Sequence, residues 1–418
     1  MMKLITTLLF SLLLCACSSN QNNANIHCHI EGIVHDRPES DKLLLYVGVD
    51  GGIALSSQPY QKIKIRNGKF SCDIYLDKPQ YCELVFEDER QNGHWQAIDF
   101  VAGNSPIVMN LYPISDFNKT SIESTGETAE YQSYKLKLRD LQIATNEVRE
   151  KLKSEGRSYT EEYTNLISQI ESIENDSKKQ KELIERMQSM TEEQTYTPEM
   201  LAERKQYSQK RKAALLEIIG GEPTIAKLAI LASLMKYNLP EPEFISILNN
   251  TYATKYPENP MTQFCHRQIG GLGLQVGSHY TDFEAPDLEG NMHRLSDMVS
   301  DAKLVMLDLW ASWCAPCRQA SMEMIPLYEQ YKDKGFMIIG VARESKSKDA
   351  MEKAIKKDGY TWPQLIELDD RANIWSLYGC GNAAGRRILF DADGKILAFD
   401  PTIEELTAFV KNQLNTNN

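Results

Sequence analysis

The chain has 418 residues, of which 42% are hydrophobic and 25% charged, and its formal net charge is −12 at pH 7. The length exceeds one ordinary domain, and the hydrophobic fraction is enough for two or three separate cores. The acidic charge argues against a nucleic-acid-binding protein, because phosphate binding needs a basic face. Nine cysteines are too few for a disulfide-stapled scaffold of this size.

The first 25 residues predict a bacterial lipoprotein signal followed by a polar tether. The apolar run 4–14 follows a positive start and is too short to span a bilayer. Small residues precede Cys17, so we expect removal of residues 1–16, lipidation of Cys17 and a tether at 17–25. The protein would then be lipid-anchored on the periplasmic side of a membrane, inner or outer, because Ser18 gives no retention signal. An ordinary secretory signal with incidental cysteines is the alternative.

Residues 26–125 predict a small β-sandwich or barrel-like domain. The alternating runs Gln61–Ile65 and Lys69–Leu76 flank an Asn-Gly pair, which predicts a hairpin. The triplet His27-Cys28-His29 suggests a metal site, but in a strand the two histidines share one face and the cysteine faces the other. Because the three side chains cannot converge on one ion, we expect no metal there.

Residues 126–274 differ in composition and predict a helical segment. Glu, Lys, Gln and Leu dominate, and apolar residues such as Leu138, Leu141 and Leu152 recur near helical spacing. We interpret the Glu/Lys pairs along these runs as solvated helix faces rather than binding sites. The segment shows no catalytic constellation.

Residues 275–418 alternate between predicted strands and helices, which indicates an α/β domain. Leu304–Leu309 predicts a strand, and a helix follows it to about Tyr331 with a kink at Pro326. Phe336–Val341 is nearly continuous in apolar residues, as expected for a strand buried on both faces. The chain is therefore predicted to be multidomain, with a β-rich domain, a helical middle segment and a C-terminal α/β domain.

The sequence Trp313-Cys314-Ala315-Pro316-Cys317 stands where this strand ends and the helix begins. A thiolate at a helix N-terminus faces free backbone N–H groups and the positive end of the helix dipole, which lowers its pKa. Two intervening residues bring the second sulfur within bonding distance, so the pair predicts thiol redox chemistry. A zinc half-site is the alternative, but zinc needs four ligands and this region has no second Cys-x-x-Cys or close His pair. We expect Cys314 to have the lower pKa and the greater exposure, with Cys317 buried beneath it.

Two stretches of this region resemble the TlpA/ResA-like branch of the thioredoxin superfamily. They are Phe283-x-Ala285-Pro286-Asp287-Leu288-x-Gly290 and Trp310-Ala311-Ser312-Trp313-Cys314-Ala315-Pro316-Cys317-Arg318. The whole arrangement is similar to anchored thioredoxin-family lipoproteins of Bacteroidota, which carry a β-rich domain of unknown function before a helical segment. The match to the redox family itself covers the α/β region alone.

The resemblance implies a thioredoxin-like fold and a thiol–disulfide oxidoreductase that works as a reductase. In the family the first cysteine attacks a substrate disulfide and the second resolves it, which implies these roles for Cys314 and Cys317. Asp308 matches the buried acid that exchanges a proton with the resolving cysteine, and a structural strand-end acid is the alternative. The implied cofactor is the redox-active disulfide alone, with no metal. The implied partners are a disulfide-bearing extracytoplasmic protein and a thiol-type electron donor in the membrane.

One departure from the family pattern lies opposite the disulfide. The family has a cis-proline there, whereas the loop Tyr378–Arg386 has no proline and places Ala384 or Gly385 at that point. Together with Trp313 and Pro316, these residues form the expected substrate loop. A cis bond without proline costs about 2.5–4 kcal/mol. We therefore expect a trans, reshaped loop, and a modest gain in turnover when proline replaces either residue.

Other positions near the motif are ambiguous. Ala320 stands where ResA-like members often carry a glutamate, which leaves either Asp308 in that role or slower chemistry. Cys380 is expected to pack inward at an apolar position, and the alternative is a partial soft-metal site with the two active cysteines. The sequence does not fix the pairing of the remaining cysteines, which are Cys28, Cys72, Cys82 and Cys265.

Two other function classes compete with the reductase. A peroxidase of the peroxiredoxin type needs a Thr three residues before its reactive cysteine, where this chain has Ala311. A non-catalytic binding or assembly lipoprotein with a vestigial redox domain is favoured by the absent proline. The intact Cys-x-x-Cys and Asp308 oppose that alternative. Insulin reduction and peroxide consumption would separate the three classes.

Overall fold

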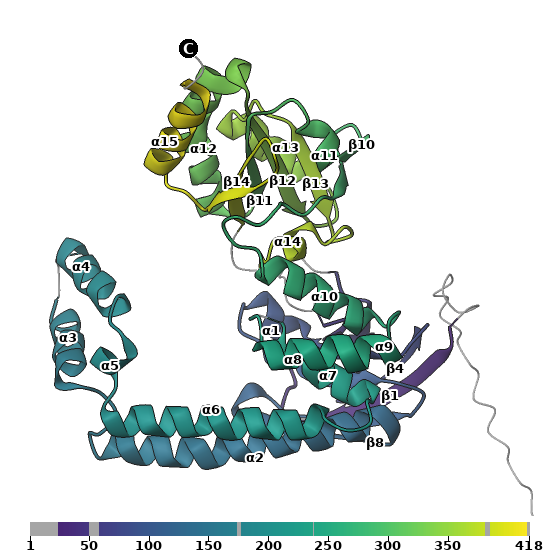
Figure 1. Cartoon of the computed structure of the whole chain (residues 1–418). Coiled ribbons are helices and arrows are strands. Elements are labelled where there is room, and N and C mark those ends of the chain that lie inside the picture. Colours follow the sequence, from purple (N-terminus) through teal and green to yellow (C-terminus); the bar gives the residue numbers. More distant parts are fainter. Residues whose placement is uncertain (1–23, 50–57, 174–176, 237, 381–384, 416–418) are drawn as a thin grey trace, which may run out of the picture.

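A computed structural model describes residues 24–49, 58–173, 177–236, 238–380 and 385–415 (Figure 1). The predicted order of a β-rich region, a helical middle segment and a C-terminal α/β domain is confirmed. The predicted signal and Cys17 lie outside the described residues. Within those ranges, no helix is long and apolar enough to cross a membrane.

The β-rich region is a sandwich of two four-stranded sheets whose inner faces enclose one apolar core. One sheet has the order β4-β1-β7-β8, and the other has the order β3-β2-β5-β6. In the first sheet, β1 runs parallel to β7 and antiparallel to β4. The bounds are β1 Ile26–Val34, β2 Lys42–Val47, β3 Gln61–Lys64, β4 Lys69–Leu76, β5 Gln80–Phe86, β6 Ile98–Ala102, β7 Ile107–Leu111 and β8 Ser121–Ser124.

The Asn67-Gly68 turn connects the two sheets instead of closing a hairpin within one. Arg66 and Lys69 pair across the turn, and both central residues have positive φ, 51° and 69°. Beyond the turn, β3 pairs with β2 and β4 pairs with β1. The predicted hairpin is therefore wrong beyond the turn. Pairing β4 with β1 turns the whole apolar face of β4 into the core, which fixes this choice of partner.

The histidines of β1 lie on its exposed side, whereas Cys28 is fully buried in the sandwich core, as strand alternation predicts. His27 Nε2 and His29 Nδ1 both contact the same oxygen of Asp73 on β4, at 2.8 and 3.0 Å. These contacts tie two strands together at the surface. The cysteines outside the C-terminal domain are all buried and free of disulfides in the described part of the chain: Cys28, Cys72, Cys82 and Cys265.

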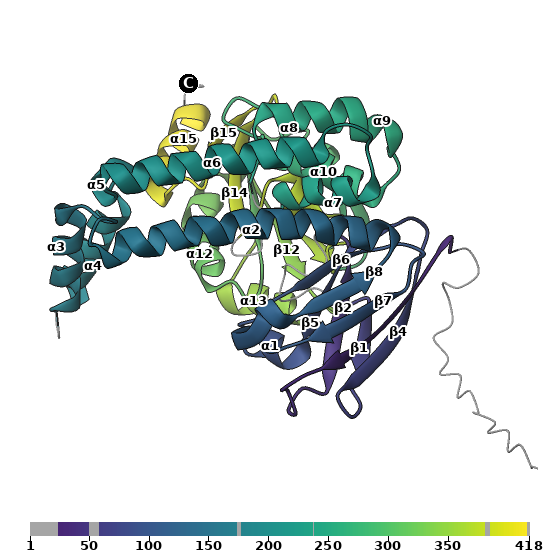
Figure 2. The same cartoon turned by 90° about the horizontal axis from the view of Figure 1, so that it is seen from below.

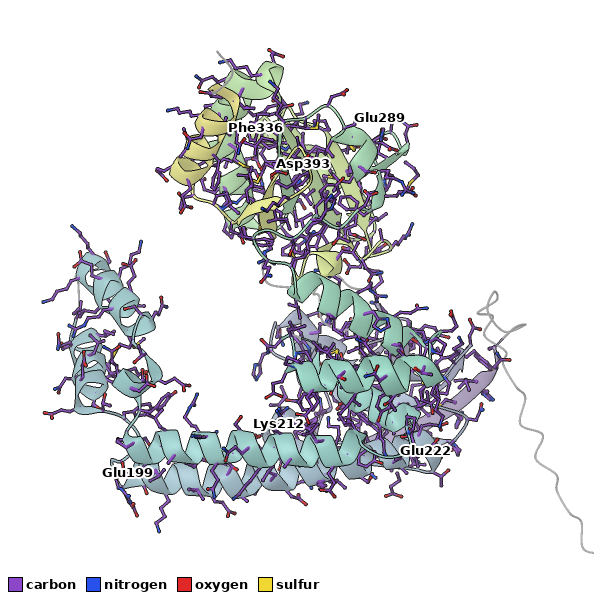
Figure 3. All side chains as sticks on the ribbon, in the orientation of Figure 1. Glu199, Lys212, Glu222, Glu289, Phe336 and Asp393 are labelled. Atoms are coloured by element: carbon purple, nitrogen blue, oxygen red, sulfur yellow. A yellow bond between two sulfur atoms is a disulfide. The ribbon has the colours of Figure 1, made fainter. Side chains whose placement is uncertain are left out.

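The helical segment includes a long arm. Helices α2 and α6 form an antiparallel pair, and α3, α4 and α5 stand at its far end (Figures 1 and 2). Arg149 Nε joins Glu203 Oε2 across the pair at 2.6 Å, and charged residues such as Glu199 and Lys212 stand along α6 (Figure 3). The bounds are α2 Gly126–Ser154, α3 Glu161–Glu171, α4 Ser177–Gln188, α5 Glu192–Thr195 and α6 Pro198–Ile219.

Of the remaining helices of this segment, α7 and α10 pack on the outer face of the second sheet. Tyr81 and Val101 from that sheet, together with Tyr131 from α2, join the buried residues of α7 and α10 in a second apolar core. This packing makes the sandwich and the helices one body. The bounds are α7 Ile225–Leu234, α8 Pro242–Ile247, the π-helical turn Leu248–Tyr252, α9 Ala253–Lys255 and α10 Pro260–Leu272.

The C-terminal domain is built on a five-stranded sheet of order β13-β12-β11-β14-β15. Strands β11, β12 and β13 are parallel, β14 is antiparallel to β11, and β15 is antiparallel to β14. Helices α12, α13 and α15 share an apolar cluster on one face, and α11 and α14 share the cluster on the other. The bounds are β9 Glu284–Pro286, β10 Met292–Arg294, α11 Leu295–Met298, β11 Leu304–Trp310, α12 Ala315–Tyr331, β12 Phe336–Glu344, α13 Asp349–Asp358, β13 Gln364–Leu368, α14 Ile374–Leu377, β14 Arg386–Asp391, β15 Ile396–Phe399 and α15 Ile403–Asn415.

The end of α10 touches the C-terminal domain backbone to backbone. A Cβ added at Gly271 would lie 2.1 Å from the Ser376 carbonyl oxygen and 2.6 Å from the Gly379 nitrogen. A Cβ added at the neighbouring Gly270 would meet nothing within 4 Å. The contact therefore needs glycine at position 271, and it sets α10 directly against α14 and the residues that follow it.

Candidate redox site

The two cysteines lie where β11 gives way to α12. Cys314 is the N-cap of α12, with extended backbone angles (φ −88°, ψ 92°), and its sulfur accepts the backbone N–H of Cys317 at 3.4 Å. The cysteines form a disulfide, and their Cα atoms are 5.3 Å apart. Pro316 stands in the first helical turn, where a missing N–H is tolerated. The sulfur of Cys314 therefore lies at the positive end of a long helix.

The exposure of the two cysteines differs from the prediction. Cys314 is 4% exposed, whereas Cys317 is half-buried. The expectation that Cys314 is the more exposed is wrong for this disulfide form, because Cys314 belongs to the apolar cluster that contains Ala311 and Trp375. Trp313, by contrast, is 48% exposed, and its ring centroid lies 6.3 Å from that of Trp375.

A buried carboxylate holds the turn before Cys314. Glu344 ends β12, and its oxygens accept the Ser312 N–H at 2.7 Å and the Ser312 hydroxyl at 2.8 Å. Burial raises the pKa of Glu344, and the two bonds from Ser312 oppose that rise. Arg318 adds another tie, since it donates to the Ser312 carbonyl at 3.3 Å and holds the Asp358 carboxylate at 2.6 and 2.7 Å.

Glu344 was missed by the sequence reasoning. The available signal was a charged residue at the end of a largely apolar strand, because the carboxyl ends of neighbouring parallel strands meet at one edge of a sheet. A parallel partner for β11 would have placed such a residue beside the Cys-x-x-Cys turn.

Asp308 lies on the sheet face that α12 covers, and it is 2% exposed. The Ser321 hydroxyl donates to Asp308 Oδ2 at 2.6 Å. Burial raises the pKa of Asp308 to about 6; the Ser321 bond and the positive charge of Arg387 oppose this rise, and the negative charge of Asp400 adds to it. A carboxyl with this pKa can accept and return a proton near neutral pH.

A cavity of about 320 Å³ connects Asp308 with the disulfide. Cys317 and Pro316 form part of its wall, whereas Cys314 does not, and Ala320 leaves room where a longer side chain would intrude. The volume is enough for several water molecules, and carboxylates and arginines supply polar partners for them. The arrangement can therefore pass a proton between Asp308 and Cys317 through water.

Gly385 closes the cavity from the side of β14. Its N–H donates to the Cys317 sulfur at 3.3 Å, and a Cβ there would lie 1.8 Å from the Leu309 carbonyl oxygen. The structure argues against the expected gain in turnover from a proline at position 385, because proline would remove the donor and collide with β11. Ala384, the other candidate in the substrate loop, lies outside the described residues. None of the described residues has a cis peptide bond.

Cys380 packs inward, as predicted: it is partly buried and lies against the apolar cluster that contains Cys314. Burial raises the pKa of the Cys380 thiol to about 12. Its backbone N–H donates to the Trp375 carbonyl at 2.9 Å, which fixes the start of the loop. Across the described ranges, no group of three or more His, Cys, Asp or Glu side chains is placed to hold a metal ion.

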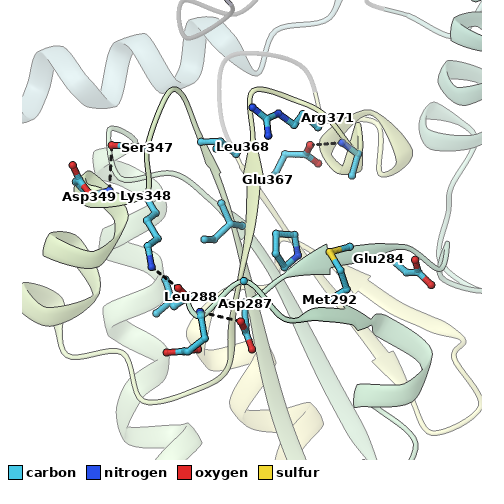
Figure 4. Close-up of a pocket in the computed structure, with 15 residues that line it drawn as sticks. Glu284, Asp287, Leu288, Met292, Ser347, Lys348, Asp349, Glu367, Leu368 and Arg371 are labelled. Carbon is cyan, nitrogen blue, oxygen red and sulfur yellow. Dashed lines mark hydrogen bonds between the residues drawn. The ribbon is translucent and has the colours of Figure 1, made fainter.

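A second hollow, of about 800 Å³, lies between the β9–β10 hairpin and the loops that follow β12 and β13 (Figure 4). Asp287 shapes one wall: its Oδ1 accepts the N–H groups of Glu289 and Asn291 at 2.9 and 2.8 Å, and its Oδ2 contacts His293 Nε2 at 2.7 Å. The His293 bond holds the pKa of Asp287 well below its ordinary range. The Pro-Asp-Leu motif singled out in the sequence is thus explained by a turn.

Comparison with known proteins agrees with this geometry. Residues 276–399 match the model of the AhpC/TSA family. The thiol-disulfide oxidoreductase ResA of Geobacillus thermodenitrificans (strain NG80-2) is 36% identical over 123 residues, which cover 29% of this chain and 67% of that protein. ResA of Bacillus anthracis is 30% identical over 141 residues, covering 33% of this chain and 78% of that protein.

Among solved structures, the thioredoxin domain of a thiol-disulfide oxidoreductase from Bacteroides vulgatus is 31% identical. The match covers 34% of this chain and 99% of the chain in that structure, with a TM-score of 0.31. The AhpC/TSA match falls on the domain that carries the disulfide, Asp308 and the cavity. Through this thioredoxin-like C-terminal domain, the chain belongs to the ResA family of thiol-disulfide oxidoreductases.

Proposed function

We propose that this chain is a lipid-anchored, extracytoplasmic thiol–disulfide reductase that acts through Cys314, Cys317 and Asp308. The observation that carries the proposal is one arrangement: a disulfide at the start of α12, with a buried carboxyl that shares a cavity with Cys317. The carboxyl has a pKa of about 6, which suits proton exchange at neutral pH.

The proposed reaction begins with the reduced pair. The Cys314 thiolate attacks one sulfur of a substrate disulfide, a mixed disulfide forms, and the other substrate sulfur leaves as a thiolate that is protonated by solvent. The Cys317 thiol then gives its proton to the Asp308 carboxylate and attacks the Cys314 sulfur. The Cys314–Cys317 disulfide forms again, and the second substrate sulfur leaves with the proton that Asp308 held. Two electrons pass from the dithiol to the substrate.

The assignment of the two cysteines rests on their surroundings. Cys314 occupies the helix N-cap, where backbone N–H groups stabilise a thiolate. Cys317 shares the cavity with Asp308, which suits the thiol that must lose its proton during resolution. Because Cys314 is 4% exposed in the disulfide form, reduction must uncover its sulfur before a protein substrate can reach it.

The substrate is proposed to be a disulfide-bearing extracytoplasmic protein. The exposed Trp313 and Pro316 flank the disulfide and are the side chains best placed to contact the substrate, with Gly385 behind the sulfur of Cys317.

Each turnover consumes two electrons, so a thiol-type donor in the membrane is the proposed source of these electrons. Lipidation at Cys17 would hold the domain near that donor. A Cys17→Ala chain is expected to lose both acyl labelling and its place in the membrane fraction.

Insulin reduction by the purified full chain, with a dithiol as electron source, tests the activity. We expect disulfide reduction that is lost in Cys314→Ser and in Cys317→Ser. A folded chain that reduces no protein disulfide would contradict the proposal and favour the non-catalytic lipoprotein. Hydrogen peroxide consumption at a comparable rate would favour a peroxidase instead.

A further inference from the structure

Ser321 stands at the centre of the proton-accepting site although no motif points to it. It lies on α12 one turn after Cys317 and is fully buried. Its hydroxyl oxygen lies 2.6 Å from Asp308 Oδ2 and 3.0 Å from the Cys317 carbonyl oxygen. A serine hydroxyl has one proton to donate, so it serves one of these two acceptors at a time.

We propose that Ser321 is a positioning residue for Asp308: it fixes Oδ2 of the carboxyl against α12 and leaves Oδ1 to the cavity beside Cys317. This inference rests on the proposed function of Asp308. Among the described residues, Ser321 is the hydrogen-bond donor to this carboxyl. Without it, the carboxyl would keep its burial but lose the contact that sets which oxygen faces the disulfide.

The charged groups around Asp308 come from several elements, and none of them replaces Ser321. Arg387 on β14 attracts the carboxylate and Asp400, after β15, repels it. On the opposite side, Tyr360 interacts with the Ser321 hydroxyl and with the Asp358 carboxylate, the latter at 3.1 Å. The Asp358 charge is itself neutralised by the bidentate contact with Arg318. The direct bond to Asp308 thus comes from a neutral donor, the Ser321 hydroxyl.

The competing interpretation is that Ser321 serves the helix alone. In that case its proton would go to the Cys317 carbonyl, a common bond from a serine to the residue four positions earlier. The two roles differ in the measurable property that each affects. A helix bond affects the stability of α12, whereas a bond to Asp308 also affects the pKa of the carboxyl.

The test compares Ser321→Ala with the unchanged full chain in its reduced form. The first readout is the titration of the Asp308 carboxyl by carbon NMR, assigned with Asp308→Asn. The second is the single-turnover rate at which Cys317 resolves a mixed disulfide, measured from pH 5 to 9. Ser300→Ala is the matched control, because it removes an exposed serine hydroxyl that bonds a backbone carbonyl in the same domain.

We expect the Asp308 pKa to rise by about one unit in Ser321→Ala, because a hydrogen bond to the charged form is lost. The resolution rate should fall about fivefold at pH 6 and approach that of the unchanged chain above pH 8, where the carboxyl is ionised in both. In an Asp308→Asn background, Ser321→Ala should bring no further change in rate. Ser300→Ala should match the unchanged chain.

A folded Ser321→Ala chain with an unchanged Asp308 titration would overturn the inference. So would an equal loss of rate in the presence and absence of the Asp308 carboxyl, which would assign Ser321 to the helix. Failure of the proposed function looks different: resolution would then be unaffected by Asp308→Asn itself, while the NMR titration would still report whether Ser321 bonds the carboxyl.

Discussion

The β-sandwich and the C-terminal domain both carry closely placed thiols, and only one set is built for chemistry. Cys28, Cys72 and Cys82 lie in the middle of strands and face one apolar core. Burial raises the pKa of Cys28 to about 11 and that of Cys72 to about 12, and Cys82 is raised further in the same direction. Cys314 instead caps a helix, where an N–H group meets its sulfur.

The two sets of thiols differ in their backbone setting, a helix start against positions within strands, because Cys314 is buried as well. Cys314 is itself only 4% exposed, yet its sulfur accepts an N–H at the start of a helix, whereas the backbone contacts of Gly103 with Cys28 and of Ala102 with Cys82 do not outweigh burial. A thiol becomes a nucleophile where a helix begins and stays inert where a strand passes through a core. The Asp308 carboxyl, which shares a cavity with Cys317, adds the proposed proton acceptor to the C-terminal pair.

The strongest way to break this comparison is to remove one thiol from each set. Cys314→Ser should reduce insulin-reduction turnover to the uncatalysed background, because the attacking sulfur is gone. Cys72→Ser should keep turnover while lowering stability, since it places a hydroxyl in an apolar core. Turnover assays with thermal melts check both. Loss of activity in a folded Cys72→Ser chain would assign the sandwich thiols a part in catalysis.

Alkylation of the reduced native chain at pH 7 sharpens the contrast. A thiol with a pKa of about 11 is ionised in only about one molecule in 10⁴ at this pH. Cys314 should therefore react at least about 10²-fold faster than Cys28, read by mass spectrometry of labelled peptides. Comparable rates for the two sets would mean that helix-start placement gives no advantage here.

The role of Asp308 is tested by Asp308→Asn, which keeps the shape and removes the proton acceptor. Resolution by Cys317 should slow by about 10²-fold at pH 7, while the initial attack by Cys314 changes little. In the unchanged chain the resolution rate should fall as pH drops through about 6, because the carboxyl is then protonated. That pH dependence should vanish in Asp308→Asn; its persistence would place the proton acceptor elsewhere.

The same substitution has a stability consequence of opposite sign. The folded-state pKa of about 6 lies above the ordinary value of 3.8, so the folded state binds the proton more tightly than the unfolded state. The ionised, buried carboxylate therefore destabilises the fold above pH 6, and this cost disappears below pH 4. Asp308→Asn should raise the unfolding free energy by up to about 3 kcal/mol at pH 7 and hardly at all at pH 4, as denaturant titration would show.

A smaller effect is expected at Gly385. Gly385→Ala should destabilise the chain by about 1–3 kcal/mol, because the new methyl meets the Leu309 carbonyl. Gly270→Ala is the matched control, since its Cβ meets open space within a helix, and it should leave stability equal or higher. Equal behaviour of the two variants in thermal melts would contradict the close packing of Gly385 behind Cys317.

Sequence patterns predicted the element types well where one face or both faces of an element are buried. The alternation in β4 and the continuous apolar run of β12 are examples, because burial dictates those patterns directly. Partner choice was harder: the turn after β3 was visible, but which sheet β4 joins depends on contacts far along the chain. Likewise, Asp308 was expected from the resemblance to the thioredoxin family, whereas Ser321 and Glu344 become visible only when α12 and β12 are packed on β11.

The glycine contact between α10 and the residues after α14 joins the helical segment to the C-terminal domain, close to the disulfide. Gly379 has a φ of 65° and sits against the Gly271 backbone, one residue before Cys380 and six before Gly385. Even a methyl group at position 271 would push these two parts apart. A C-terminal domain excised from the chain would lose α10, and Gly379 would no longer pack against the Gly271 backbone. Turnover measured on such a fragment would describe a different catalyst from the intact protein.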